Sequence, residues 1–160
     1  TDLVGPDADA HSFSPSPDDA RKLAGADIVF VNGLGFEGWM ERLIRASGTK
    51  APVVVASSGA KTIAGSRDHA DHDHKHDPND LADDHSDPHA WQSVANAKLY
   101  VAAIRDGLSR IDAAHAGTYS ENARAYAEKL DALDAEIRAS TAQSPEERRH
   151  IPPTHDSFAY

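Results

Sequence analysis

Residues 26–56, ADIVFVNGLGFEGWMERLIRASGTKAPVVVA, decide the fold class of this 160-residue chain. Two short apolar runs rich in β-branched residues, 26–32 and 52–56, predict strands that are buried on both faces. Between them, residues 37–46 carry apolar side chains at helical spacing and end at Gly48. A strand, a helix and a strand in this order predict an α/β fold with a parallel sheet.

Helical patterns lie on both sides of this unit. Ser16-Pro17-Asp18-Asp19 combines a capping hydroxyl, a proline and two acids, which predicts a helix from Pro17 to about residue 24. A second helix is predicted from Trp91, and a third follows a break near Gly117 and ends at Ser144-Pro145. The third helix has a predicted buried apolar stripe, made of Tyr119, Ala123, Tyr126, Leu130, Leu133 and Ile137.

The charge of the chain is uneven. Sixteen Lys and Arg against 26 Asp and Glu give a net charge of −10, and residues 68–87 contribute eight Asp and one Lys, a local charge of −7. This excess repels phosphates, so it argues against a nucleic-acid partner and favours cations. Because cysteine is absent, any metal must be held by His, Asp, Glu or backbone groups.

Ten histidines are present, and half of them lie in the acidic loop. Alternating imidazoles and carboxylates suit zinc, nickel or copper at low specificity. A purification tag or a solvated surface tract is the alternative, but the position between a strand and a helix favours metal interaction. Binding there is expected to be weak and transient, because a mobile loop loses entropy when it closes around an ion. These histidines are His69, His72, His74, His76 and His85.

Three further histidines, His11, His89 and His155, are far apart in the sequence, and none has a neighbour at the spacing of a zinc finger or of H-E-x-x-H. Spacing alone favours surface or capping roles for each. The alternative is a shared site, because loops beyond the carboxyl ends of parallel strands converge on one crevice.

Several segments resemble, in the right order, motifs of the cluster A-I solute-binding proteins, the ZnuA/TroA-like group that delivers zinc or manganese to ABC importers. They are LVGPDADAHSFSPSP (3–17), ADIVFVNGLGFEGWMERLI (26–44), the His/Asp-rich insertion, DPHAWQSVANAKLYVAAI (87–104) and THDSFAY (154–160). The arrangement and length of the acidic loop resemble those of the AztC subgroup. The resemblance implies a bilobal metal-binding protein of which this chain is the amino-terminal part: a lobe over residues 1–116 with the His/Asp-rich loop 58–88, a long linking helix over 117–143, and the start of a carboxy-terminal lobe over 144–160.

The same resemblance implies that His11, His89 and His155 are the metal ligands, with a fourth, carboxylate ligand outside this chain. Manganese members tend to have a carboxylate in the third position, so His155 favours Zn²⁺. Asp87 either orients an imidazole or caps the following helix, and we expect the cap.

The resemblance therefore predicts a monomeric, periplasmic protein that captures zinc and delivers it to an ABC permease, with a periplasmic zinc metallochaperone as a candidate second partner. A manganese, nickel or copper carrier is the first alternative, and a metal-binding adhesin active in cell adhesion or a zinc buffer is the second. An enzyme is not expected, because H-E-x-x-H, a nucleophile elbow and a phosphate-binding glycine loop are all missing from the sequence.

Overall fold

The computed structural model describes residues 1–64, 86–145 and 160. Within these ranges the order of elements is α1 (Pro17–Ala24), β1 (Val29–Val31), α2 (Met40–Ser47), β2 (Val53–Val55), the 3-10 turn η2 (Ala90–Gln92), α3 (Val94–Ile111), the 3-10 turn η3 (Ala113–His115) and α4 (Ala116–Gln143). The predicted α/β class, with helices around a small parallel sheet and a long final helix, is confirmed.

The two strands pair in parallel, with Val29 opposite Val53 and Val31 opposite Val55. Successive side chains of β1 point to opposite faces of the sheet. Val29 and Val31 belong to a buried cluster that also contains Leu23, Trp39, Met40 and Leu43, from α1 and the start of α2. The core of the domain therefore lies between the sheet and the α1–α2 layer.

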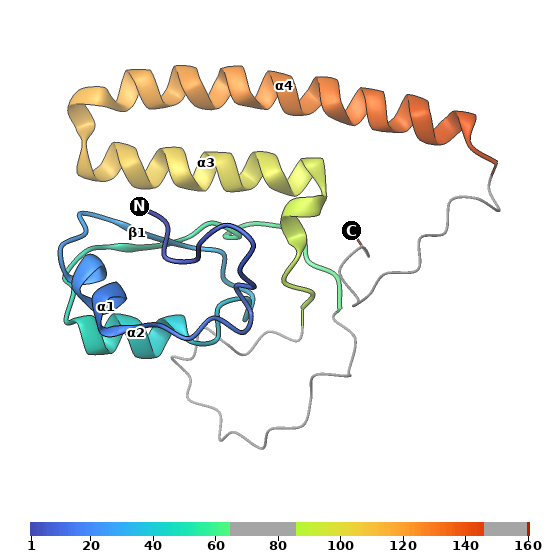
Figure 1. Cartoon of the computed structure of the whole chain (residues 1–160). Coiled ribbons are helices and arrows are strands. Elements are labelled where there is room, and N and C mark those ends of the chain that lie inside the picture. Colours follow the sequence, from blue (N-terminus) through green and yellow to red (C-terminus); the bar gives the residue numbers. More distant parts are fainter. Residues whose placement is uncertain (65–85, 146–159) are drawn as a thin grey trace.

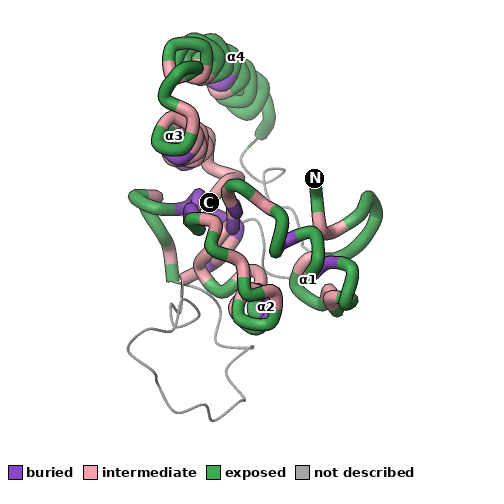
Figure 2. Tube along the Cα trace, turned by 90° about the vertical axis from the view of Figure 1, so that its left-hand side faces the viewer, coloured by how far each residue is buried: buried purple, intermediate pink, exposed green. Residues whose placement is uncertain are grey.

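The opposite face of the sheet packs against α3, at Gly107. A Cβ atom at that position would lie 2.9 Å from Cγ2 of Val54 and 3.1 Å from Cε1 of Phe30, so a glycine permits the close approach. Helix α4 runs back along α3 on the side away from the sheet (Figures 1 and 2). The layers are therefore α1 with α2, the sheet, α3 and α4.

Helix α1 begins at Pro17, as predicted. The Ser16 side chain and the backbone N–H of Asp19 form one half of a capping box, and the Asp19 carboxylate accepts from the backbone N–H of Ser16 in the other half. Helix α2 begins at Met40, later than predicted. Residues 33–35 all have positive φ angles, of 85°, 56° and 73°, which no helix tolerates. The chain therefore turns sharply between β1 and α2 before the helix begins.

The predicted apolar stripe of α4 is only partly buried in the described structure. Leu130 is buried, whereas Tyr126, Leu133 and Ile137 are 53%, 45% and 47% exposed, so their predicted burial is wrong. The helix begins at Ala116, after the turn η3, and its first turn contains Gly117, where we had expected the break. Among the helices described, none combines the length and the apolar character needed to cross a lipid bilayer.

Candidate metal site

His11 lies in the loop before α1, and Trp39 holds this loop in place. The indole N–H of Trp39 donates to the backbone carbonyl of Ala10 at 2.7 Å. The Trp39 ring is buried and also contacts the ring of Phe13, with centroids 4.9 Å apart. Asp9 accepts from the backbone N–H of His11 at 2.9 Å. The residue before α2 therefore fixes the backbone from which the His11 imidazole projects.

His89 lies immediately before η2 and is buried, with 7% of its surface exposed. The Asp87 carboxylate, 3% exposed, accepts from the backbone N–H of His89 at 2.9 Å and lies 2.7 Å from its Nδ1. The 3-10 turn has no side-chain cap. Our expectation that Asp87 caps a helix is therefore wrong, and the carboxylate instead orients the imidazole.

The two imidazoles meet, although they lie 78 positions apart in the sequence: Nε2 of His11 is 3.2 Å from Nε2 of His89. A carboxylate can only accept, so Nδ1 of a neutral His89 carries the proton and its Nε2 presents a lone pair towards His11. Two nitrogens bound to one tetrahedral ion, at about 2.0–2.1 Å each, lie about 3.3 Å apart. The observed separation matches that value, and it also permits a direct hydrogen bond between the rings.

Two aromatic rings lie beside the pair, in which His89 is buried and His11 is exposed. The Phe36 ring lies 4.4 Å from the His11 ring and 5.8 Å from the His89 ring, in both cases edge to face. Trp91 lies 5.3 Å from His89 and 4.9 Å from Phe36. Apolar neighbours lower the local dielectric constant around the buried His89, so charges and dipoles interact more strongly there than in water.

The backbone beside His89 is held by a side-chain network from β1 and α3. The Asn32 amide donates to the carbonyl of Pro88 at 3.1 Å, and the Tyr100 hydroxyl donates to the Asn32 side-chain oxygen at 2.9 Å. Burial raises the pKa of Tyr100 to about 12, so the hydroxyl remains a donor at neutral pH. The end of β1 therefore positions the loop of the second histidine.

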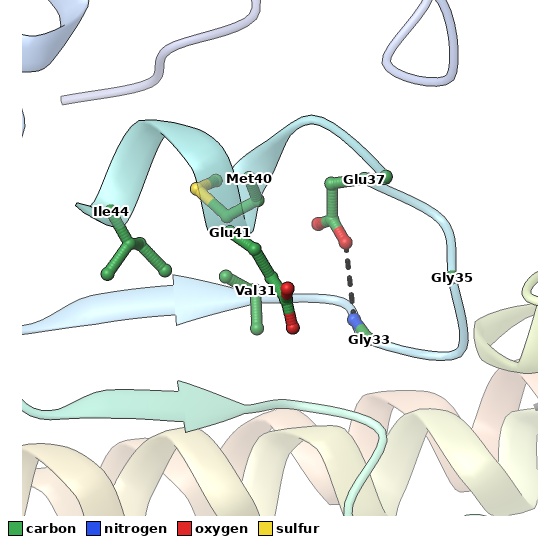
Figure 3. A pocket seen from close by; sticks show the side chains of 8 residues that line it. Val31, Gly33, Gly35, Glu37, Met40, Glu41 and Ile44 are labelled. Carbon is green, nitrogen blue, oxygen red and sulfur yellow. Dashed lines mark hydrogen bonds between the residues drawn. The ribbon is translucent and has the colours of Figure 1, made fainter. Parts of the chain in front are cut away.

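Glu37 lies in the turn between β1 and α2, beside a small pocket that Val31, Met40 and Ile44 also line (Figure 3). Its carboxylate accepts from the backbone N–H of Asn32 at 2.7 Å and of Gly33 at 3.2 Å. Burial raises the pKa of Glu37, and these two hydrogen bonds oppose the rise.

Sequence reasoning placed Glu37 in the first turn of a helix and left Phe36 and Asn32 without a role. The available signal was an acidic residue within a glycine-rich turn, GLGFEG, directly after a buried strand. Backbone N–H groups in such a turn need an acceptor.

Tyr160, the last residue, reaches the same region. Its hydroxyl donates to the backbone carbonyl of Asp87 at 2.6 Å and accepts from the backbone N–H of Ile63 at 3.3 Å. The backbone N–H of Asp87 in turn donates to the carbonyl of Ile63 at 2.9 Å. Tyr160 therefore joins the end of the chain to the residue that orients His89.

His155 and the acidic-loop histidines His69, His72, His74, His76 and His85 lie outside the described residues. In the ranges that the structure does describe, no three His, Asp or Glu side chains are grouped as a metal site. The described geometry thus brings together two of the three predicted ligands, His11 and His89.

His115 is found elsewhere, as expected, close to the carboxyl end of α3. Its Nδ1 is 2.8 Å from an oxygen of Asp112, and both side chains are at the surface. This pair repeats the carboxylate–imidazole contact of the candidate site, and no other imidazole among the described residues makes a described contact with it.

Comparison with known proteins identifies the relatives of the chain. The profile of the ZnuA family, described as zinc-uptake complex component A, periplasmic, matches residues 1–160. The iron-binding protein YfeA of Yersinia pestis is 34% identical over 99% of this chain and 47% of its own length. The manganese-binding lipoprotein MntA of Bacillus subtilis is 32% identical over 100% of this chain and 48% of its own length. A solved structure of a zinc-bound ZnuA deletion mutant superposes with a TM-score of 0.80, at 26% identity, over 99% of this chain and 55% of that one.

The chain thus spans about half the length of the curated relatives that it matches. The matched family model describes a periplasmic component of an uptake complex, and the relatives include a substrate-binding lipoprotein of a metal ABC transporter, so the predictions of an extracytoplasmic location and of a protein that is not an enzyme are confirmed. The named relatives bind different metals, iron and manganese among them, so the comparisons leave the identity of the metal open.

Proposed function

This chain belongs to the ZnuA family of periplasmic metal-uptake components, and we propose that it captures Zn²⁺ outside the cytoplasm and delivers it to an ABC-type importer. The ion is the cargo of the protein. It is held between His11 and His89, with His155 as the third ligand and a carboxylate outside this chain as the fourth.

The observation that carries this proposal is the contact between Nε2 of His11 and Nε2 of His89, at 3.2 Å. Zinc binds neutral imidazole, and a metal-bound histidine usually donates its other ring N–H to a carboxylate or a carbonyl. The Asp87 carboxylate, 2.7 Å from Nδ1 of His89, supplies that acceptor.

Support for His155 as the third ligand comes from Tyr160. The two lie five positions apart in the sequence, and five residues of extended chain span at most about 17 Å. Because the Tyr160 hydroxyl is bonded to the backbone of Asp87, this length restricts how far His155 can lie from the pair. The motif THDSFAY, which contains both residues, is the last of the segments that resemble the family motifs.

The choice of zinc over other ions rests on the ligand set. Three imidazoles suit zinc, nickel and copper better than manganese, which prefers oxygen ligands. Manganese, nickel and copper carriers remain the alternatives, and relatives named for manganese and iron make a direct competition measurement necessary.

The remaining parts of the proposal concern the whole protein. We propose that it is a monomer, that α4 links an amino-terminal lobe, residues 1–116, to a carboxy-terminal lobe beginning at residues 144–160, and that its partners are an ABC permease and a zinc metallochaperone. The acidic loop, with a charge of −7 over residues 68–87, raises the local concentration of cations and so speeds capture. A metal-binding adhesin or a zinc buffer would bind the ion but would not stimulate an importer.

The test is a competition titration of the purified protein against a chromophoric zinc chelator, with the variants His11→Ala, His89→Ala and His155→Ala. Each is expected to weaken binding by roughly 100-fold or more, since loss of outer partners alone costs 10–100-fold. His115→Ala is the matched control, because it removes an imidazole paired with a carboxylate far from the site. Wild-type affinity in all three variants would overturn the proposal.

A further inference from the structure

The turn between β1 and α2 has a backbone conformation that does not persist by itself. Gly33, Leu34 and Gly35 have positive φ angles of 85°, 56° and 73°. Leu34 has a side chain, and L residues other than glycine adopt this region at a cost. Gly33 has no freedom to change, because a Cβ atom there would lie 2.5 Å from Cγ1 of Val55. Such a conformation is kept only where its surroundings fix it.

The Glu37 carboxylate provides a fixing contact. Its two oxygens accept from the N–H groups of Asn32 and Gly33, at 2.7 and 3.2 Å, and so join the end of the turn to its beginning. A backbone hydrogen bond from the N–H of Phe36 to the carbonyl of Gly33, at 3.1 Å, lies within the turn that these Glu37 contacts close. Glu37 thereby restrains the residue before it, which is Phe36.

Phe36 is the ring that contacts both imidazoles. Its centroid is 4.4 Å from that of His11 and 5.8 Å from that of His89, with interplanar angles of 66° and 82°. A change in the conformation of the turn therefore moves the Phe36 ring, which contacts both imidazoles. Small displacements matter here, because ligands have to be held within about 0.5 Å of the binding geometry.

We propose that Glu37 is a positioning residue for the His11–His89 pair: its carboxylate closes the turn and thereby fixes the Phe36 ring against both imidazoles. Glu37 touches neither imidazole in any described contact, and it acts through Phe36. The proposal rests on the proposed function for its effect on metal binding, but its effect on the imidazoles exists without metal.

The first measurement uses the metal-free protein. The imidazole C–H protons of His11 and His89 lie near the Phe36 ring, so their NMR shifts report the position of that ring. Glu37→Gln, which keeps one acceptor oxygen, is expected to shift both sets of signals, and Glu37→Ala is expected to shift them further. The signals of His115 should not move in the same spectra, and Glu136→Gln, on the exposed face of α4, is the charge-matched control.

The second measurement is a double-mutant cycle on zinc affinity. Glu37→Gln is expected to raise the dissociation constant about tenfold, as loss of an outer partner of a ligand does. With Phe36→Leu already present, the same change should cost less than about twofold, because residues that act through one another are not additive. A purely structural role would lower thermal stability and leave the cycle additive.

The proposal is overturned if the folded Glu37→Gln protein keeps the wild-type imidazole signals, or if its cost in affinity is the same with and without Phe36. If Glu37→Ala does not fold, the NMR spectra of Glu37→Gln and the double-mutant cycle still test the proposal. If wild-type protein binds no metal, the proposed function fails, and the metal-free NMR comparison still tests Glu37.

Discussion

The Oδ1 atom of Asp87 lies 2.7 Å from Nδ1 of His89, and both side chains are buried. This contact fixes which nitrogen of the imidazole carries the proton and directs the lone pair of Nε2 towards His11. Asp87 also accepts a hydrogen bond from the backbone N–H of His89, so a single carboxylate orients both the ring and the main chain of this residue. Asp87 therefore orients the imidazole that we propose as a metal ligand.

Replacing Asp87 with Asn should weaken zinc binding about 10- to 100-fold, the usual cost of losing an outer partner of a ligand. The amide keeps the size of the side chain but removes its charge and one acceptor. Chelator competition measures the change, with Asp112→Asn at the surface pair as control. Equal affinity in the Asp87→Asn variant and wild type would show that the contact is only structural.

Replacing His155 with Glu should shift the metal preference towards manganese. A carboxylate is a harder ligand than imidazole, and manganese prefers oxygen ligands. Competition between Zn²⁺ and Mn²⁺ on the wild-type and variant proteins gives the ratio of affinities. An unchanged ratio would argue against His155 as a ligand of the main site.

Deleting residues 68–85 should slow metal loading and leave the equilibrium affinity of the main site largely unchanged. Attraction between opposite charges raises association rates, whereas retention depends on the imidazoles. Stopped-flow mixing with dilute zinc, at low and high salt, separates the two quantities. Loading at the wild-type rate in low salt would refute the capture role of the acidic loop.

Stability at acid pH should depend on Asp19, at the start of α1. The backbone N–H and then the hydroxyl of Ser16, followed by Lys22, lower the pKa of Asp19 from 3.8 to about 2. A carboxyl with a lower pKa in the folded state adds stability above its unfolded pKa and loses it as pH falls towards the folded value.

Chemical denaturation should therefore give Asp19→Asn a lower free energy of unfolding than wild type at about pH 6. This difference should disappear between about pH 4 and pH 2. Glu136→Gln, at an exposed position of α4, controls for loss of one carboxyl. Ser16→Ala should cost about 1 kcal/mol near neutral pH, as helix caps do. If the difference in free energy of unfolding between Asp19→Asn and wild type stays constant down to about pH 2, this account is contradicted.

Local chemistry explains which elements the sequence predicted. Pro17 and the acids after it define the start of α1, and the valines of 52–56 define the centre of β2. The start of α2 was missed because the positive φ angles of the preceding turn leave only glycines as a signal, and Leu34 is not one. The exposure of Tyr126 was missed because the spacing of apolar residues identifies an apolar helix face but does not show whether another element packs against it.

The candidate site was predictable in a different way. No local pattern joins His11 to His89, and the resemblance of their motifs to a family first paired them. The role of Asp87 was one of two alternatives, and choosing between them needed the position of the imidazole. Glu37 and Phe36 act through the shape of a turn, which spacing in a single sequence does not reveal.

The most direct test is a crystal structure of the protein with zinc, using anomalous scattering at the zinc edge to locate the ion. The account predicts one strong peak about 2.0–2.1 Å from Nε2 of both His11 and His89. A zinc ion bound elsewhere, with the two imidazoles still in contact with each other and free of metal, would contradict it.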